Sequence, residues 1–568
     1  MTHGMLSVIL QTVILFSLPC VGQTPGTSTE PANHPVFPTG TVTPLGTQIA
    51  ALLADPGVSR AHWGIAVMAI DGTPLYGFDE GKLFRPASNA KLFTTAAAMA
   101  MLGPDKRFTT GVVAEGSLTN GTLHGDLVLR GGGDANFASG YALPYVPPAQ
   151  RIKVSGTVAP DPLADLDDLA AQVAAKGVRR IDGDIVGDDT RFEHSPYPEG
   201  WSTDDLLWGY GAPVSALTIH DNQLDLRIEP APKGSSAKPT ITLTPAVPFY
   251  TVNETPVDGH LWSVGTQDLG RNEVLEQRVL NERDFQIFGY VDAKYGAYTD
   301  ELAIDRPAEF AAAALRQALE RHGIVVKGGI RARHYDSQFL GSESQAARAT
   351  PNEVTVGQPG EYDPFATRPD RECQAQRVAG GPEEHLLAEK ESVPLVQDLT
   401  LTLKVSQNLH AEIMLRNAGV NRDCIAGLYL HTALAWERAF LVHAGIDGGD
   451  FVFYDGSGLS TKDLVTPRAA AQLLAYATKQ PWFAQWKAAL PVGGEDGTLS
   501  SRFPDAPLKD HLFAKTGTLG ESRGLSGYVD AASGREVIFS IFVDDHAPNG
   551  SNDRVVMDKI VAAIAANE

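Results

Sequence analysis

The sequence is short of positive charge and of long hydrophobic runs, and both shortages exclude classes of protein. Its 568 residues include 46 Lys and Arg against 68 Asp and Glu, so the net charge is −22 with histidine neutral. Because phosphate binding needs a positive surface, we expect no nucleic-acid partner. Hydrophobic residues make up 43% of the chain and charged residues 20%. That balance is ordinary for a globular protein and excludes a mainly disordered chain or a polytopic membrane protein.

Cysteine is also scarce, and patterns that bind metals are missing from the sequence. Of the 3 cysteines, Cys20 lies close to the N-terminus, and Cys373 and Cys424 lie farther along the chain. The latter two could pair in an oxidising compartment, although the sequence does not show that they lie close together. The sequence has no His-Glu-x-x-His motif and no spaced cluster of cysteine and histidine. We therefore expect no metal and no cofactor.

The N-terminus is typical of an exported protein. Residues 6–18 form an apolar run that is too short to span a membrane comfortably, and small residues follow at Cys20 and Gly22. We expect residues 1–22 to be a signal peptide, and an uncleaved N-terminal anchor is the alternative. Residues 23–42 are rich in Pro, Thr and Gly and are predicted to be a flexible leader. No stable membrane span is expected after cleavage.

The rest of the chain divides by composition into a split domain and its insertions. The length allows about three or four domains, and 56 Gly and 37 Pro indicate many turns and much sheet. Residues 43–106 and 393–568 mix helical and strand patterns and are predicted to form one α+β domain. Residues 107–334 favour inserted β-rich domains, with helices near 163–176 and 308–322. Residues 335–392 are predicted to be an irregular insertion or loop.

Ser88 and Lys91 form a Ser-x-x-Lys motif at the start of an Ala-rich segment that is predicted to be a helix. Residues three apart share a helix face, so the hydroxyl and the amine can meet. A serine hydroxyl becomes a good nucleophile only when a base takes its proton, and a lysine serves as that base only when burial or nearby positive charge keeps it neutral. Taken alone, the motif also fits a capped helix with a surface lysine. Ser235 and Lys238 repeat the spacing in a Gly/Ser loop, which we interpret as a solvated turn.

A second motif, Ser406-Gln407-Asn408, is the only Ser-x-Asn in the chain and precedes a predicted helix. The hydroxyl of Ser406 could relay protons. The amide of Asn408 offers both a hydrogen-bond donor for a substrate carbonyl and an acceptor. Simple helix capping explains an isolated match equally well.

A third motif, Lys-Thr-Gly-Thr at 515–518, follows an apolar stretch that predicts a strand. Lys515 and Thr516 could hold a carboxylate, and Gly517 would let a ligand backbone approach the strand. The N–H groups of Thr518 and Ser88 could together bind an oxyanion. An ordinary polar edge strand is the alternative for this motif alone.

In this chain order, the three motifs are typical of penicillin-recognising serine enzymes. The long stretch between Ser88 and Ser406 requires an inserted body, which agrees with the β-rich middle. Beyond the motifs, the chain closely resembles the D-alanyl-D-alanine carboxypeptidase/endopeptidase family, the class C low-molecular-mass penicillin-binding proteins. The resemblance runs from about residue 43 to near the C-terminus, apart from 335–385, and includes the segments 125–134, 181–188, 210–216, 455–460, 490–499 and 525–528.

This resemblance implies a fold and a set of roles. The fold would be a transpeptidase-like domain, with a five-stranded antiparallel sheet flanked by helices and with β-rich domains inserted after the Ser-x-x-Lys helix. Ser88 would be the acyl-enzyme nucleophile and Lys91 its general base. Ser406 and Asn408 would assist proton transfer and position the peptide. Gln407 departs from the family pattern at a side chain that points away, so we expect a small effect.

The strand motif would complete the site by binding substrate. A cationic Lys515 would hold the terminal carboxylate, and Thr516 and Thr518 would add hydrogen bonds along the strand. The implied function is a serine-type D-Ala-D-Ala carboxypeptidase, a DD-endopeptidase, or both, acting on peptidoglycan stem peptides and sensitive to penicillin. Its partners would be stem peptides and β-lactams, in the periplasm or cell envelope of a bacterium.

Three alternatives stay open at this point. A β-lactamase or esterase could use the same serine and lysine, although the large insertion argues against it. A catalytically silent wall-binding scaffold is possible, although intact Ser88, Lys91 and Lys515 argue against it. A Ser-His-Asp hydrolase is not excluded by counting, because the chain has 15 histidines. The segment Asp-Gly-Ser-Gly-Leu at 455–459 only loosely resembles a nucleophile segment, and we assign it to a turn.

Overall fold

The computed structural model describes most of the chain. The described residues are 35–40, 43–147, 150, 161–232, 238–254, 271–335, 384–423, 430–548 and 550–568. The expected signal peptide, most of the expected leader, Ser235, Cys373 and Cys424 lie outside these ranges. Within them, no helix combines the length and the apolar composition that crossing a membrane requires.

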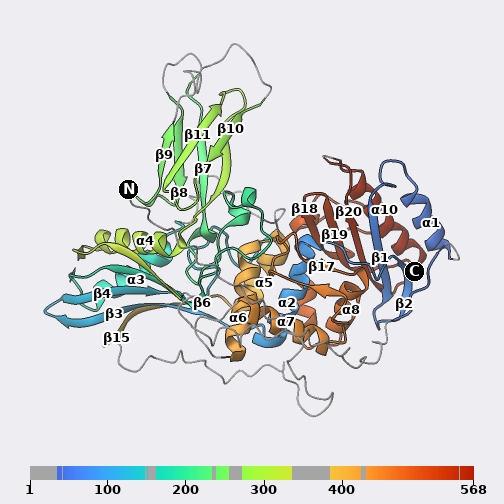
Figure 1. The fold of residues 1–568 in the computed structure, drawn as a ribbon, viewed down its shortest axis with the longest axis horizontal. Helices are drawn as coiled ribbons and strands as arrows, with labels where there is room; N and C mark the ends of the chain where they lie inside the picture. Colours follow the sequence, from blue (N-terminus) through green and yellow to red (C-terminus); the bar gives the residue numbers. More distant parts are fainter. Residues whose placement is uncertain are drawn as a thin grey trace, which may run out of the picture. The chain divides into compact units, whose positions relative to one another are not determined.

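The two ends of the chain share one five-stranded sheet (Figure 1). β1 pairs with β20 in antiparallel register, from His62 opposite Asp544 to Ala69 opposite Val537. The other neighbouring strands are antiparallel as well. Residues separated by more than 400 positions therefore build a single unit. In sheet order the strands are β18 (Leu512–Leu519), β19 (Ser522–Asp530), β20 (Glu536–Asp544), β1 (His62–Ala69) and β2 (Pro74–Phe78).

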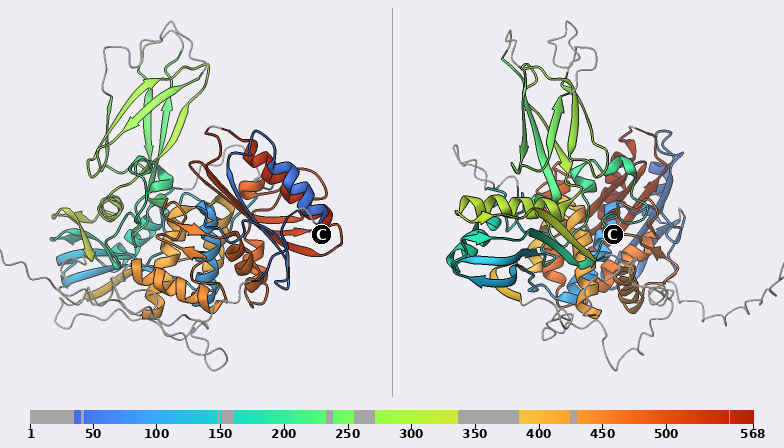
Figure 2. Two further views of the ribbon diagram at one scale, coloured as in Figure 1. Left: turned by 45° about the vertical axis from the view of Figure 1, so that its right-hand side comes forward. Right: turned by 60° about the vertical axis from the view of Figure 1, so that its left-hand side comes forward.

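Helices cover both faces of this sheet, so its central strands are buried on both sides. Side chains of β1 alternate between two hydrophobic clusters: Trp63 and Ile65 pack toward one, and Ala66 and Met68 toward the other. α1 (Pro44–Leu53) and α10 (Asn552–Asn567) lie side by side over the first face (Figure 2). The second face packs against α2 (Ala90–Leu102) and α8 (Pro467–Ala477).

A group of helices continues the second layer and carries one of the sequence motifs. Helix α6 packs against α2 and α7, and α5 packs against α6. Ser406 lies between α5 and α6, at the C-terminal end of α5. The group consists of α5 (Leu395–Val405), α6 (Asn408–Asp423), α7 (Leu430–His443) and α9 (Phe483–Ala488), next to the small pair β16 (Phe451–Val452) and β17 (Leu464–Val465).

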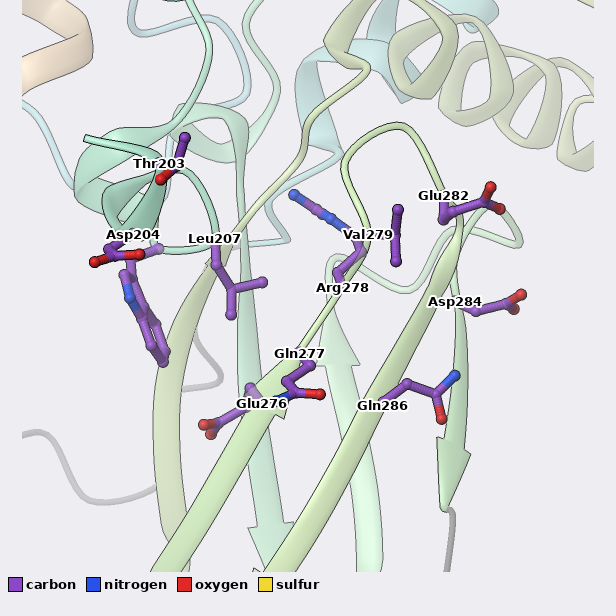
Figure 3. A pocket seen from close by; sticks show the side chains of 11 residues that line it. Thr203, Asp204, Leu207, Glu276, Gln277, Arg278, Val279, Glu282, Asp284 and Gln286 are labelled. Atoms are coloured by element: carbon purple, nitrogen blue, oxygen red, sulfur yellow. The ribbon is translucent and has the colours of Figure 1, made fainter. Parts of the chain in front are cut away.

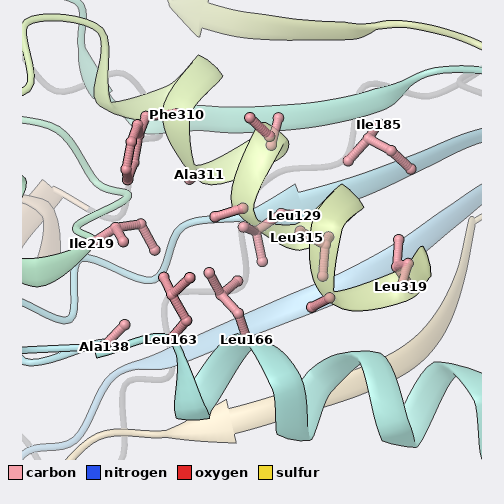
Figure 4. Close-up of a cluster of buried hydrophobic side chains, with 14 of the residues drawn as sticks. Leu129, Ala138, Leu163, Leu166, Ile185, Ile219, Phe310, Ala311, Leu315 and Leu319 are labelled. Atoms are coloured by element: carbon pink, nitrogen blue, oxygen red, sulfur yellow. The ribbon is translucent and has the colours of Figure 1, made fainter. Parts of the chain in front are cut away.

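Between α2 and α5 the chain forms a second body around a seven-stranded sheet. Helices α3 (Ala164–Ala175) and α4 (Pro307–Arg321) bury Leu166, Phe310 and Leu315 against strand residues such as Leu129 and Ile185 (Figure 4). The strands are β3 (Thr109–Thr119), β4 (Thr122–Arg130), β5 (Arg180–Ile181), β6 (Ile185–Glu193), β13 (Val325–Val326), β14 (Ile330–Tyr335) and β15 (Glu384–Glu391).

Two three-stranded sheets add to this body. Leu226, Ile228, Phe285 and Ile287 join the same hydrophobic cluster. One sheet contains β7 (Gln223–Glu229), β8 (Thr240–Thr244) and β12 (Tyr298–Ala303), and the other contains β9 (Thr251–Glu254), β10 (Glu273–Gln277) and β11 (Asp284–Tyr290). The predicted mixture of helices and sheets is confirmed.

Two local predictions were wrong. The end of the expected irregular segment 335–392 is a strand, because β15 pairs antiparallel with β3 and buries Leu387 and Ala388. Only a few of its side chains are apolar, so the sequence pattern did not indicate a strand here. Strands at the edge of a sheet often carry charged side chains. The Ala-rich helix, which was predicted to start at the Ser88 motif, begins at Ala90, because a short 3-10 turn, Ala87–Asn89, precedes it.

Candidate active site

Ser88 and Lys91 meet at the junction of a turn and a helix. Ser88 lies in the 3-10 turn, and Lys91 lies in the first turn of α2. Ala87, immediately before Ser88, has φ 47°, a backbone conformation that residues with a side chain rarely adopt. Lys91 Nζ lies 2.8 Å from Ser88 Oγ. The predicted meeting of the hydroxyl and the amine is therefore present in the structure.

The amine of Lys91 is fully buried and surrounded by oxygen atoms that carry no full charge. It donates to Asn408 Oδ1 at 2.6 Å and to the carbonyl of Ser457 at 2.7 Å. Burial lowers the pKa of Lys91 to about 7, against the raising effect of the Asp455 and Glu412 carboxylates. At neutral pH a large share of Lys91 is therefore the free amine, which is the form that can accept the proton of a serine.

Lys515 reaches the same place from strand β18. Its Nζ donates to Ser406 Oγ at 2.8 Å and to the carbonyl of Thr516 at 2.8 Å. Burial, followed by the charge of Lys91, holds the pKa of Lys515 well below its ordinary value. This direction works against the cationic form that we expect to hold the substrate carboxylate.

Asn408 joins the first two motifs and also contacts the second body. Its Oδ1 accepts from Lys91, and its Nδ2 donates to the carbonyl of Tyr210 at 2.8 Å. One of the two N–H groups of this amide therefore donates to a backbone carbonyl, and the expected bond to a substrate carbonyl would use the other. Tyr210 lies in a 3-10 turn, Gly209–Gly211, between β6 and β7, so the second body contributes to this site.

The remaining strand residues lie along β18. Thr516 Oγ1 donates to Thr498 Oγ1 at 2.7 Å, and Thr518 Oγ1 accepts from Arg523 at 3.3 Å. Thr518 is exposed and Thr516 is half-buried, so both hydroxyls are close to solvent.

Gly517 has a different role from the one we expected. A Cβ atom at this position would lie 2.7 Å from the carbonyl oxygen of Pro86 and 3.1 Å from Ala87 Cβ. The missing side chain therefore makes room for the turn that carries Ser88, and not for a ligand backbone. Gly524, opposite Gly517 on β19, likewise makes room for Asn89.

Two buried carboxylates behind Lys91 were missed at the sequence level. Glu412 accepts from the backbone N–H of Gly456 and Ser457 and pairs with Arg416 at 2.7 Å. Asp455 accepts from the backbone N–H of Ser457 and from Trp201 Nε1 at 2.8 Å. Together they orient the Ser457 carbonyl toward Lys91. The segment 455–460 was visible as a family-like stretch, but its residue types alone indicated only a turn.

Two other serines resemble nucleophiles in sequence and are placed differently. Ser457 is buried, and its hydroxyl donates to Asp455 at 3.0 Å. Residues 520–524 read Gly-Glu-Ser-Arg-Gly, but Ser522 is a fully buried residue at the start of β19, after a hairpin turn. A Gly-x-Ser-x-Gly nucleophile sits at a sharp turn from a strand into a helix, which this segment does not form.

Helix α6 connects the motif residues to the second body through a buried charged group. His410 Nδ1 lies 2.6 Å from Asp398 Oδ1, and His410 Nε2 lies 2.8 Å from Asp221 Oδ1. Burial opposes the charge on the ring, but the two carboxylates outweigh it and raise the pKa of His410 to about 10. The imidazolium therefore bridges α5, α6 and the segment that leads into β7.

A large cavity lies elsewhere, and none of the motif residues lines it. Its volume is about 680 Å³, and its lining includes Leu207, Arg278 and Gln286 (Figure 3). It lies between strands β10 and β11 and the turn that contains Thr203. The chemistry of the Ser88 cluster, and not cavity size, identifies the candidate active site.

A serine that contacts a buried lysine, beside a Ser-x-Asn residue pair and a Lys-Thr-Gly strand, defines a penicillin-recognising serine enzyme. The family model of the D-Ala-D-Ala carboxypeptidase 3 (S13) family matches residues 45–342 and 374–565, so the chain belongs to that family. The prediction of a serine-type D-Ala-D-Ala carboxypeptidase is thereby confirmed at the level of the family.

Two relatives and one solved structure match this chain over most of its length. The D-alanyl-D-alanine carboxypeptidase of Actinomadura sp. (strain R39) is 30% identical over 536 residues, which cover 92% of this chain and 85% of the relative. D-alanyl-D-alanine carboxypeptidase DacB of Haemophilus influenzae is 24% identical and is matched over 80% of its length. The crystal structure of penicillin binding protein 4 (dacB) from Haemophilus influenzae has the same fold, with a TM-score of 0.68, 21% identity, and coverage of 90% of this chain and 97% of that one.

Proposed function

We propose that Ser88 attacks the carbonyl of the penultimate D-Ala of a peptidoglycan stem peptide and forms an acyl-enzyme. The bond to the terminal residue breaks and releases D-alanine, and water then hydrolyses the ester. When the leaving group is the amine of a cross-bridge, the same steps cut a cross-link. The observation that carries this proposal is the 2.8 Å contact between Ser88 Oγ and the buried amine of Lys91.

Lys91 would act as the general base for this attack. Burial lowers its pKa to about 7, so the amine can accept the Ser88 proton near neutral pH. The proton could then pass toward the leaving amine through Ser406, whose hydroxyl contacts Lys515 at 2.8 Å. Asn408 would keep Lys91 aligned, because its Oδ1 accepts one of the lysine's hydrogen bonds.

Lys515, Thr516 and Thr518 would bind the free carboxylate of the substrate. Burial without a full negative partner lowers the pKa of Lys515. An incoming carboxylate would supply that partner and raise the pKa again, so the ligand and the lysine charge would stabilise each other. The half-buried Thr516 and the exposed Thr518 would add hydrogen bonds to the ligand.

We also propose that the sheet shared by the two ends of the chain, with its helices, is the transpeptidase-like catalytic domain formed by 43–106 and 393–568. Residues 107–334 would be inserted domains. An exported enzyme in the periplasm or cell envelope would meet peptidoglycan and β-lactams there. One solved structure of the Haemophilus influenzae protein is described as complexed with a β-lactam, which supports this choice of ligand.

The direct test is labelling with a fluorescent penicillin, followed by mass spectrometry of the modified peptide. We expect one adduct, on Ser88, and no labelling or D-alanine release by Ser88→Ala. Ser235→Ala is the matched control, because Ser235 and Lys238 have the same sequence spacing, and it should label normally. D-alanine release by Ser88→Ala would contradict the assignment of the nucleophile. Rapid penicillin turnover would instead indicate a β-lactamase.

A second test addresses the substrate carboxylate. Lys515→Ala should weaken the processing of peptides that end in a free carboxylate more than that of the same peptides with an amidated end. Equal losses on both peptides would contradict the proposed role of Lys515. Mass spectrometry of digested wall fragments would then show whether the terminal D-Ala bond or the cross-link is cut.

A further inference from the structure

Three side chains with metal-ligating atoms meet in the second body, on elements other than those that carry the Ser88 cluster. Asp189 belongs to β6, His194 directly follows β6, and His334 belongs to β14. One ligand atom from each lies within 4.8 Å of the other two. The ring centroids of the two histidines are 3.9 Å apart, and His334 Nδ1 lies 2.8 Å from Asp189 Oδ1.

The backbone explains why these residues meet. β6 and β14 run parallel, with Arg333 paired to Asp188, but the next registered pair joins Tyr335 to Glu193. Two steps along β14 thus correspond to five steps along β6, so β6 bulges between these pairs. The bulge carries Asp189 and leads back to His194, whose N–H donates to the carbonyl of Tyr335 at 2.8 Å.

The carboxylate is held in place from behind. The side chain of Asp189 is only 7% exposed, and its Oδ2 accepts from Ser215 Oγ at 3.0 Å. Its other oxygen faces His334. Fixing a ligand through a second hydrogen bond is how proteins orient metal-binding groups. His194 is exposed, so ions can reach the cluster from solvent.

The nearby charges do not oppose a cation strongly. The groups acting on His334 besides Asp189 are Glu309, which favours positive charge, and Arg306, which disfavours it. Arg306 and Glu309 form an ion pair with each other at 2.6 Å. Burial disfavours positive charge on the His334 ring, and among the charged groups near the ring Asp189 acts most strongly.

We propose that Asp189, His194 and His334 bind one divalent transition-metal ion, with Zn²⁺ preferred over Mg²⁺ and Ca²⁺. Two imidazoles and a carboxylate are ligands that suit Zn²⁺, and water would fill the fourth position. Binding replaces the hydrogen bond between His334 and Asp189 and displaces any ring proton that would occupy a ligating nitrogen. The ion would tie the end of β14 to the bulge of β6.

The test is a Zn²⁺ titration of protein without a histidine tag, after treatment with EDTA and dialysis. Calorimetry should give one ion per chain, and Zn²⁺ should raise the melting temperature. His194→Ala removes an exposed ligand with little risk to the fold and should weaken Zn²⁺ binding by about tenfold or more. His334→Ala should do the same, and Mg²⁺ should produce neither signal.

The matched control is His124→Ala. His124 forms an exposed pair with Asp182 at 3.0 Å in the same body, but with one histidine instead of two. Its replacement should leave Zn²⁺ affinity unchanged. Equal affinity in the unsubstituted protein and in His194→Ala, or no binding by the unsubstituted protein, would overturn the proposal. Acylation of Ser88 should be the same with and without Zn²⁺, because the site lies on other elements.

Discussion

Two buried nitrogen-containing groups lie near the start of helix α6, and their surroundings give them opposite charge states. Lys91 contacts a hydroxyl, an amide oxygen and a backbone carbonyl, and burial lowers its pKa to about 7. His410 contacts the carboxylates of Asp398 and Asp221, which raise its pKa to about 10. Both side chains are fully buried. The oxygen atoms in contact, and not burial itself, therefore decide which group keeps its proton.

The two groups that contact helix α6 therefore have different roles, one chemical and one structural. Asn408 on α6 contacts Lys91, and two residues later His410 binds α6 to the segment leading into β7. A neutral amine can exchange a proton with a serine. A charged imidazole between two carboxylates instead acts as a fixed link between elements. We therefore predict that replacing Lys91 removes activity with little loss of stability, and that replacing His410 lowers stability without loss of activity.

The largest expected effect is on activity in Lys91→Met. Without a base beside Ser88, the rate of acylation by a reporter β-lactam should fall by about a hundredfold to ten-thousandfold. The melting temperature should fall less than in His410→Leu, because Lys91 contacts only uncharged oxygen atoms and its removal leaves no carboxylate without a partner. Stopped-flow acylation and thermal unfolding measure the two quantities. Lys238→Met is the control, and its rate should match that of the unsubstituted protein. A strong loss of stability in Lys91→Met would contradict the proposed difference between Lys91 and His410.

The largest expected effect on stability is in His410→Leu. Removing the imidazolium leaves Asp398 and Asp221 as uncompensated buried carboxylates, which should cost about 3–5 kcal/mol of unfolding free energy. Denaturant unfolding measures the loss. His511→Leu is the control, because His511 pairs with Asp530 at an exposed position and should lose about 1 kcal/mol or less. Equal losses in the two variants would refute the special role of the buried link.

The same link predicts how stability depends on pH. The raised pKa of His410 means that its contribution is present in full below the unfolded value of about 6.5. It is lost as the pH rises through the folded value of about 10. The carboxyl of Asp134 also interacts with His410, and burial raises the pKa of Asp134 to about 7. Melting temperatures should therefore fall with alkaline pH, and more steeply in the unsubstituted protein than in His410→Gln.

A smaller effect is expected for Gly517→Ala. The added Cβ would lie 2.7 Å from the Pro86 carbonyl and would push the turn that carries Ser88 away from β18. Crowding of this kind costs about 1–3 kcal/mol, and acylation should slow because Ser88 moves relative to Lys91. Gly329→Ala is the control, because the nearest atom to its new Cβ lies 3.8 Å away. A normal acylation rate in Gly517→Ala would show that the turn tolerates the displacement.

Much of the candidate site could be predicted from sequence because its key contacts begin as local motifs. Ser88 and Lys91 are three residues apart, and chain order linked them to Ser406 and Lys515. The distances between these motifs depend on sheet pairing across hundreds of residues, which no local pattern encodes. The role of Gly517 was misjudged for the same reason, since its close neighbour is the turn at Pro86.

The parts that could not be predicted depend on contacts between distant polar residues. Glu412, Asp455 and His410 are ordinary residue types in sequence, and only folding buries them together. The predicted absence of a metal came from a search for closely spaced ligands. Asp189 and His334 lie on strands that pair in parallel although they are far apart in sequence. β15 was missed because an edge strand needs few apolar residues.

The most direct test of the central claim is the pH dependence of Ser88 acylation. If Lys91 is the base and burial sets its pKa, the rate constant for acylation by a β-lactam should rise with pH around a midpoint near 7. A midpoint near the ordinary lysine value of about 10.4, or a rate that does not change with pH, would contradict the account.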